Sequence, residues 1–195
     1  MRVFLGVTGA SGAPYAARLL RALVDAGCEV GLSASASGVE VLATELYGEP
    51  SLPREEVLRR FVEPAGGAVS VYAPDDYSSP YASGSAKVDA YVICPCSMST
   101  VGTLAAGAMA NLIHRAASVA LKERRPLVLV PRETPLSSIH LDGLSRLQQA
   151  GAVILFAAPG FYHGPQTIDD LVDFVVARCL DQLGIESSLV QRWGA

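Results

Sequence analysis

The stretch that decides the fold is Val3-Phe-Leu-Gly-Val-Thr8, an apolar run that passes through Gly9-Ala-Ser-Gly12 into an amphipathic segment at about Pro14–Ala26. The run has the length of a buried strand, and a proline is favoured in the first turn of a helix. The sequence therefore predicts a strand, a glycine-rich turn and a helix. Such a turn lets the backbone and the free N–H groups of the helix approach an anion.

The turn lacks the Gly-x-Gly-x-x-Gly pattern of dinucleotide sites, and no acidic residue ends the second apolar run. NAD is therefore a poor fit. A tight turn whose helix is N-capped by Ser11, without any ligand, remains open as the alternative.

Apolar runs and helical segments alternate along the rest of the chain. Continuously apolar strands are typical of a parallel sheet that is covered on both faces. We therefore expect one domain over residues 1–195, an α/β doubly wound, Rossmann-like (flavodoxin-like) fold with helices on both faces. The expected strands are Val3–Thr8, Cys28–Ala34, Ala90–Cys94, Leu127–Pro131 and Val153–Ala157, and the expected helices are about Pro14–Ala26, Val39–Tyr47, Val101–Ala108, Leu112–Glu123, Ser138–Ala150 and Ile168–Leu183.

The segment Gly48–Lys87 interrupts this alternation. It holds a charged helical piece at Arg54–Arg60, a short candidate strand at Val69–Tyr72 and then a turn-rich stretch. We interpret it as an excursion of the same domain.

The composition limits the classes of function. Only 17% of the 195 residues are charged and 50% are hydrophobic, so part of the surface is expected to be covered by other subunits of a homo-oligomer. The net charge of −4 gives no basic field for nucleic acid. No apolar run approaches the roughly 20 residues of a membrane span, and no signal pattern is seen, so we expect a cytoplasmic protein. The four cysteines are expected to be buried free thiols.

Small or hydrogen-bonding residues follow the expected strands. Ser35 follows the second, Ser97-Met-Ser-Thr100 the third, Arg132-Glu133 the fourth and a loop around Tyr162 the fifth. The carboxyl ends of parallel strands are where ligands bind, so these residues suit a phosphate-bearing cofactor. A cation beside a carboxylate can hold phosphate and exchange protons.

Two other residues stay ambiguous on sequence alone. The apolar stripe of the last helix is formed by Ile168, Val172, Val175, Cys179 and Leu183. Arg178 lies at the edge of that stripe, as either a snorkelling side chain or an anion contact. Tyr162 is either a loop anchor or an anion donor. The histidines lack metal-ligand spacing and no Ser-x-x-Lys or Gly-x-Ser-x-Gly motif occurs, so metal and acyl-enzyme chemistry are not expected.

Four segments together resemble the UbiX-type (UbiX/Pad-like) flavin prenyltransferases. The resemblance covers nearly the whole chain, is weakest over Gly48–Lys87, and departs from the common pattern at Ala36, where many members carry lysine. The segments are Gly9–Gly12, Cys94-Pro-Cys-Ser-Met-Ser-Thr100, Leu121-Lys-Glu-Arg-Arg-Pro-Leu-Val-Leu-Val-Pro-Arg-Glu-Thr-Pro135 and Pro159-Gly-Phe-Tyr-His-Gly-Pro-Gln166.

The resemblance implies a role for each matching residue. Lys122, Tyr162 and Arg178 look like a clamp on a prenyl phosphate, with Arg115 and Arg132 nearby and some of these supplied by a neighbouring subunit. Glu133 looks like the acid–base residue, Glu45 a further candidate for proton handling, and Trp193 part of a π-rich pocket. The implied FMN contacts are Gly9, Ala10, Ser11, Ser35, Ser97, Met98, Ser99, Thr100 and Arg132.

The same resemblance implies the reaction. N5 of reduced FMN attacks the allylic carbon of dimethylallyl phosphate as phosphate leaves, and a second bond from C6 closes a ring, with Ser11 and Glu133 as candidates for removing the C6 proton. A metal-free dodecamer would pass the prenylated FMN to a UbiD-type decarboxylase, for ubiquinone synthesis or for aromatic acid breakdown. The short cationic cluster favours the monophosphate over the diphosphate.

Two alternatives differ in class. An FMN-dependent decarboxylase of a cysteine-derived carboxylate would carry a catalytic histidine after the first helix and a Pro-Ala-Ser-Ala-Asn-Thr-like segment, and neither is found here. A flavin carrier without catalysis would leave Lys122, Arg132, Glu133 and Arg178 without a task.

Overall fold

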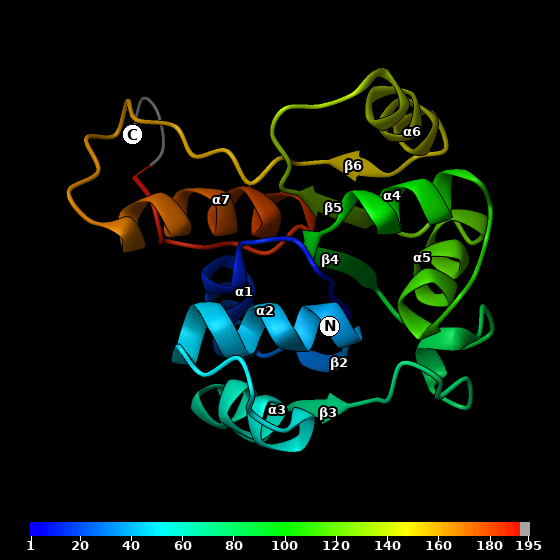
Figure 1. The fold of residues 1–195 in the computed structure, drawn as a ribbon, viewed down its shortest axis with the longest axis horizontal. Helices are drawn as coiled ribbons and strands as arrows, with labels where there is room; N and C mark the ends of the chain where they lie inside the picture. The colour runs from blue at the N-terminus through cyan, green and yellow to red at the C-terminus, as the bar shows by residue number, and fades with distance from the viewer. Residues whose placement is uncertain (192–195) are drawn as a thin grey trace.

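The computed structural model describes residues 1–191 as a parallel sheet with helices on both faces (Figure 1). The sheet has six strands in the order β3-β2-β1-β4-β5-β6, and every neighbouring pair is parallel. The predicted doubly wound α/β fold is confirmed. The strands are β1 (Arg2–Val7), β2 (Glu29–Ala34), β3 (Val69–Val71), β4 (Ala90–Cys96), β5 (Leu127–Pro131) and β6 (Val153–Ile154).

Seven α-helices and two 3₁₀ turns connect these strands within the described part of the chain. Successive strands are added toward one edge of the sheet from β1 to β3 and toward the other edge from β4 to β6. The loops after β1 and β4 therefore diverge and leave room for a ligand. The helices are α1 (Ala13–Asp25), α2 (Ala36–Tyr47), α3 (Arg54–Val62), α4 (Met98–Ala105), α5 (Leu112–Lys122), α6 (Ser138–Gln149) and α7 (Ile168–Gln182), and the 3₁₀ turns are η1 (Glu63–Ala65) and η2 (Pro80–Ala82).

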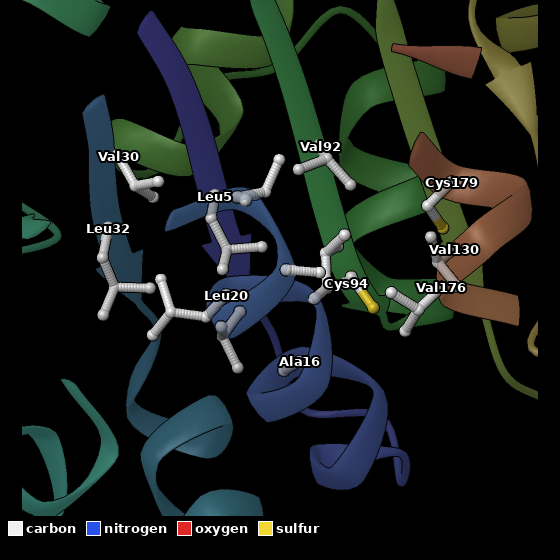
Figure 2. Packing of buried hydrophobic residues seen from close by; sticks show 14 of the residues in the cluster. Leu5, Ala16, Leu20, Val30, Leu32, Val92, Cys94, Val130, Val176 and Cys179 are labelled. Atoms are coloured by element: carbon white, nitrogen blue, oxygen red, sulfur yellow. The ribbon is translucent and has the colours of Figure 1, made fainter. Parts of the chain in front are cut away.

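The core consists of two apolar clusters, one on each face of the sheet. Alternate residues of a strand point to opposite faces, so Val3 and Leu5 belong to one cluster and Phe4 to the other. Figure 2 shows the first cluster, in which side chains of β1, β2, β4 and β5 point toward α1 and α7. Helices α4, α5 and α6 cover the opposite face. Burial on both faces explains why the strands are continuously apolar.

The four cysteines are free and buried, as predicted. Cys94 and Cys179 lie in the cluster of Figure 2. Burial raises the pKa of Cys96 and of Cys179 to about 12, so both remain thiols at neutral pH.

Two helices begin earlier than the sequence predicts. Helix α2 begins at Ala36 rather than Val39, and α4 begins at Met98 rather than Val101. The reason is that Ser35 and Ser97 serve as N-caps, so the small residues after them belong to the first helical turn.

The last strand is shorter than predicted and one predicted core residue is exposed. Strand β6 ends at Ile154, but the chain stays beside β5 as far as Ala157, because the N–H groups of Leu155 and Ala157 donate to the carbonyls of Leu129 and Pro131. Ile168, expected in the apolar stripe of the last helix, is 75% exposed at the first residue of α7.

The excursion at Gly48–Lys87 is tied to the rest of the fold. Strand β3 pairs with β2 at the edge of the sheet. Further along, the Tyr81 ring packs so closely over Gly31 that a Cβ at Gly31 would lie 2.0 Å from it. No helix in the described residues is long and apolar enough to span a membrane.

Candidate functional site

The ends of β1 and β4 are joined by one buried threonine. Thr8 is 2% exposed, its hydroxyl donates to the carbonyl of Pro95 at 3.0 Å, and it accepts the N–H of Ser97 at 2.8 Å. The hydroxyl proton and one lone pair of Thr8 therefore both bind backbone groups at the end of β4. Thr8 fixes the loop after β1 relative to the loop after β4, where we predicted the ligand to bind.

A carboxylate from the same chain lies at the N-terminus of α1. Glu45 on α2 accepts the N–H groups of Gly12 and Ala13, each at 2.8 Å. Burial is the largest single influence and raises its pKa. Hydrogen bonds from the Ser11 side chain and the two backbone N–H groups outweigh burial, so the net effect is a lowered Glu45 pKa. The helix is not N-capped by Ser11, because its cap residue is Gly12.

Two serines predicted as FMN contacts also begin helices. Ser35 accepts the N–H of Gly38 at 3.0 Å, and Ser97 accepts the N–H of Thr100 at 3.2 Å. The N-termini of α2 and α4 therefore follow β2 and β4 directly, with their partial positive charge on the carboxyl side of the sheet. Three helix N-termini, those of α1, α2 and α4, lie on this side.

The backbone in this region is closely packed where glycine allows it. A Cβ on Gly9 would lie 2.5 Å from the Cβ of Ser37. The loop after β1 is thus held against the start of α2, and this contact places Gly9 and Ala10 beside the N-terminus of that helix.

Arg132, at the end of β5, reaches the same region from the other side. Its Nε approaches the carbonyl of Ser11 at 3.4 Å, and its charge is one of the influences that lower the Glu45 pKa. The structure therefore brings together Ser11, Glu45 and Arg132. Glu133 is exposed, and its carboxylate accepts the N–H of Thr134 at 3.2 Å.

Two of the predicted phosphate-clamp residues line one cavity. Tyr162 and Arg178 border a space of about 280 Å³, together with Phe174 and Asp181. The guanidinium of Arg178 donates to the carboxylate of Asp181 at 2.6 Å. Arg178 is exposed at the wall of this cavity, and this exposure fits both a snorkelling side chain and an anion contact.

The other predicted clamp residues lie on the opposite face of the sheet. Arg115 and Lys122 belong to α5. Arg178 belongs to α7, and the Tyr162 ring packs against Phe174 of that helix; α5 and α7 cover opposite faces of the sheet (Figure 1). Lys122 is the last residue of α5 and forms an ion pair with Glu123. This hydrogen bond and the charge of Lys122 lower the pKa of Glu123. A single chain does not bring the clamp together.

The short segment 82–85, which lies beside Lys122, was not identified from the sequence. Arg115 donates to the carbonyl of Ala82 at 2.9 Å, and Arg125 donates to the carbonyl of Gly84 at 2.7 Å. A Cβ on Gly84 would lie 2.6 Å from Nζ of Lys122. The signal was the run Ser83-Gly84-Ser85, small residues in the part of the chain that the motifs cover least. Thr8 and Asp181 were also missed.

Trp193 lies outside the described residues. Among residues 1–191 no group of three or more His, Cys, Asp or Glu side chains is arranged to hold a metal ion.

Comparisons with known proteins agree with this geometry. The flavoprotein family model matches residues 1–180. The flavin prenyltransferase UbiX of Pseudomonas aeruginosa is 52% identical over 196 residues, covering 99% of this chain and 94% of that protein.

Solved structures match over the whole chain as well. The crystal structure of AnUbiX in complex with FMN and dimethylallyl pyrophosphate has a TM-score of 0.88 at 36% identity, covering 100% of this chain and 97% of that one. A dodecameric FMN-dependent UbiX-like decarboxylase from Escherichia coli O157:H7 has a TM-score of 0.87 at 38% identity, with both chains covered completely.

The fold and the loops at its carboxyl edge define a flavoprotein. Within that class, the chain belongs to the UbiX family of flavin prenyltransferases. The FMN-dependent cysteine decarboxylase TvaF, at 17% identity and a TM-score of 0.63, shares the fold alone.

Proposed function

We propose that this protein joins the dimethylallyl group of dimethylallyl phosphate to N5 and C6 of reduced FMN. The observation that carries the proposal is the pairing of two sites. Ser11, Ser35, Ser97 and Arg132 surround three helix N-termini on the carboxyl side of the sheet, and a separate cavity presents Tyr162 and Arg178. The first suits the phosphate tail of FMN and the second a smaller phosphate ester.

The flavin phosphate is proposed to bind at α2 and α4 rather than at α1. The N–H groups of Gly12 and Ala13 already donate to Glu45, whereas the Ser35 hydroxyl can donate its proton outward while it accepts from the helix. The Ser97 hydroxyl also bonds the Thr100 hydroxyl, and either can be the donor, so one hydroxyl proton of this pair remains for a phosphate. Arg132 adds a cation at the end of β5. Gly9, Ala10, Met98, Ser99 and Thr100 complete the proposed contacts.

The prenyl phosphate is proposed to bind between subunits. Tyr162 and Arg178 of one subunit would meet Arg115 and Lys122 of another, because these pairs lie on opposite faces of one chain. The dodecameric relative and the thinly charged surface support a homo-oligomer, and we propose a dodecamer. Three cations and a tyrosine hydroxyl around a departing phosphate stabilise the charge that develops as the allylic C–O bond breaks.

Proton transfer is assigned to residues near the flavin. N5 forms a bond to the allylic carbon and loses its own proton, phosphate leaves with the bonding electrons, and Glu133 donates a proton to the phosphate. In ring closure the prenyl double bond takes up a proton, C6 forms a bond to the resulting tertiary carbon, and C6 then loses its proton, with Ser11 and Glu133 as the candidates to remove it. Glu45 supports Ser11, and Trp193 is proposed to shield the allylic cation.

The test is the mass of the flavin after anaerobic incubation with reduced FMN and dimethylallyl phosphate. We expect a gain of one C5 unit, and a faster reaction with the monophosphate than with the diphosphate. Unchanged flavin, with carbon dioxide released from a peptide C-terminal cysteine instead, would support the cysteine decarboxylase alternative. FMN binding without either reaction would support a carrier.

Glu133 gives a second test. Glu133→Gln retains a hydrogen-bonding side chain but has no proton to transfer, so we expect prenylation to slow by about 100-fold, within the range of general acid catalysis. A full rate in this variant would remove Glu133 from the mechanism. We further propose that the product is passed to a UbiD-type decarboxylase in the cytoplasm.

A further inference from the structure

Three rings pack together beside the cavity that holds Tyr162 and Arg178. His163 stacks on Phe174 with ring centroids 5.3 Å apart and planes 10° apart. The Tyr162 ring meets Phe174 edge-on at 5.6 Å and meets His163 edge-on at 5.9 Å. Tyr162 therefore contacts both members of one stacked pair, and edge-to-face contacts of this kind are favourable.

The loop that carries Tyr162 closes tightly against Phe174. Tyr162 lies in the loop between β6 and α7 and is 62% exposed. Gly160 allows the loop to close, because a Cβ there would lie 3.0 Å from Tyr162 and 3.1 Å from Phe174. The contacts with His163 and Phe174 are therefore among those that position the ring.

The imidazole of His163 is unusual among these rings. Both of its nitrogens are buried and neither has a hydrogen-bond partner in the structure. An unpaired buried polar atom is unfavourable. His163 does not line the cavity itself. Its contribution must therefore come from the flat ring and not from hydrogen bonding to a ligand in that cavity.

We propose that His163 is a positioning residue: its ring, stacked on Phe174, holds Tyr162 in the orientation in which the tyrosine hydroxyl meets the phosphate of the prenyl donor. This inference rests on the proposed function, since it assigns Tyr162 to that phosphate. Phe174 serves as the platform for both rings and also lines the cavity.

The test compares substitutions that remove the ring with one that keeps it. His163→Ala removes the stacking, so we expect KM for dimethylallyl phosphate to rise about 3- to 10-fold, the range of one aromatic pair. FMN affinity and kcat at saturating prenyl donor should change less than about 2-fold. His163→Phe retains a flat ring without the unpaired nitrogens, so its KM should return to within about 2-fold of the original value.

A matched control comes from the same loop. Phe161 is 72% exposed, and Phe161→Ala removes an aromatic ring of similar size that is absent from the stack. We expect no change in its KM. Should His163→Ala fail to fold, His163→Leu answers the same question, because leucine provides apolar volume without a flat ring and should raise KM.

Several outcomes would overturn the inference. An unchanged KM in both His163→Ala and His163→Leu would show that the ring does not position Tyr162. A KM as high in His163→Phe as in His163→Ala would show that the nitrogens matter instead. Failure of the proposed function is recognised separately, since the unsubstituted protein would then give no prenylated flavin at all.

Discussion

The loops at the carboxyl edge of the sheet and the predicted phosphate clamp differ in how far one chain completes them. At the edge, Thr8, Glu45 and Arg132 join β1, α2 and β5 by short contacts. In the clamp, Tyr162 and Arg178 line a cavity on the α7 side, whereas Arg115 and Lys122 lie on α5 across the sheet.

The electrostatics of the two regions differ in the same way. In the clamp of the single chain, Arg178 is paired with Asp181 and Lys122 with Glu123. At the edge, the anion Glu45 occupies the N-terminus of α1. The Ser35 hydroxyl at α2 accepts the N–H of Gly38, and the Ser97 hydroxyl at α4 bonds both the N–H and the hydroxyl of Thr100. From this difference we propose that a monomer can prepare the flavin site, whereas the prenyl phosphate site depends on assembly.

The largest expected effect comes from dividing the clamp between subunits. Lys122→Ala or Arg178→Ala should each lower kcat/KM by about 30- to 150-fold, the loss expected for one charge-assisted hydrogen bond of about 2–3 kcal/mol. Co-expression of the two variants should restore activity, because a site that draws its lysine and its arginine from different subunits is intact in about a quarter of random pairings. The measurement is the prenylation rate of the mixed oligomer.

The control for that mixture is Lys122→Ala co-expressed with Arg115→Ala. Both residues belong to α5, so one subunit supplies both and no mixed site is complete. Restored activity in this control, or none in the first mixture, would contradict a clamp shared in this way.

The next largest effect concerns the loops at the carboxyl edge of the sheet. Thr8→Val leaves the buried N–H of Ser97 without an acceptor, so we expect a loss of about 1–3 kcal/mol in the free energy of unfolding. FMN should bind about 10-fold more weakly because the loop after β4 is no longer fixed. Urea unfolding and FMN titration measure the two effects. Thr8→Ser keeps the hydroxyl and should restore both; if it does not, the hydroxyl is not the reason.

A smaller effect separates capping from ligand binding. Ser35→Ala removes the N-cap of α2 and should cost about 1 kcal/mol in the free energy of unfolding. Thr167→Ala removes the N-cap of α7 and should cost about as much. Only Ser35→Ala should weaken FMN binding, as measured by fluorescence quenching of FMN. Equal FMN affinity in the two variants would place the flavin phosphate elsewhere.

The smallest effect is the pH dependence of Glu45. Its pKa is lowered in the folded protein, so the charged carboxylate contributes stability above the unfolded-state pKa of about 4.3, and this is lost as the pH falls through the folded-state value. Glu45 is exposed, so Glu45→Gln should cost at most about 1 kcal/mol at pH 7. Urea unfolding from pH 7 to pH 3.5 should show that difference shrinking; a constant difference would rule out the charge as its source.

The helix boundaries show where sequence reasoning reached its limit. The apolar strands and the Gly9–Gly12 turn were predictable because a strand buried on both faces must be apolar and a tight turn needs glycine. The starts of α2 and α4 were not, because Ser35 and Ser97 suit a loop and a helix cap equally well until the backbone after them is known.

Glu45 shows the same limit at the site. The sequence marked it only through resemblance, and its place at the N-terminus of α1 depends on how α2 packs against α1. The pairing of Arg178 with Asp181 and the stacking of His163 on Phe174 likewise depend on side-chain packing at α7.

By itself the sequence determined the doubly wound sheet, the burial of the cysteines and the edge at which polar residues gather, because hydrophobic periodicity and turn chemistry act over a few neighbouring residues. The tertiary structure decided which polar groups are already paired, and that Lys122 and Arg178 lie on opposite faces of the sheet. Those outcomes depend on contacts between residues far apart in the chain, and local patterns carry no information about them.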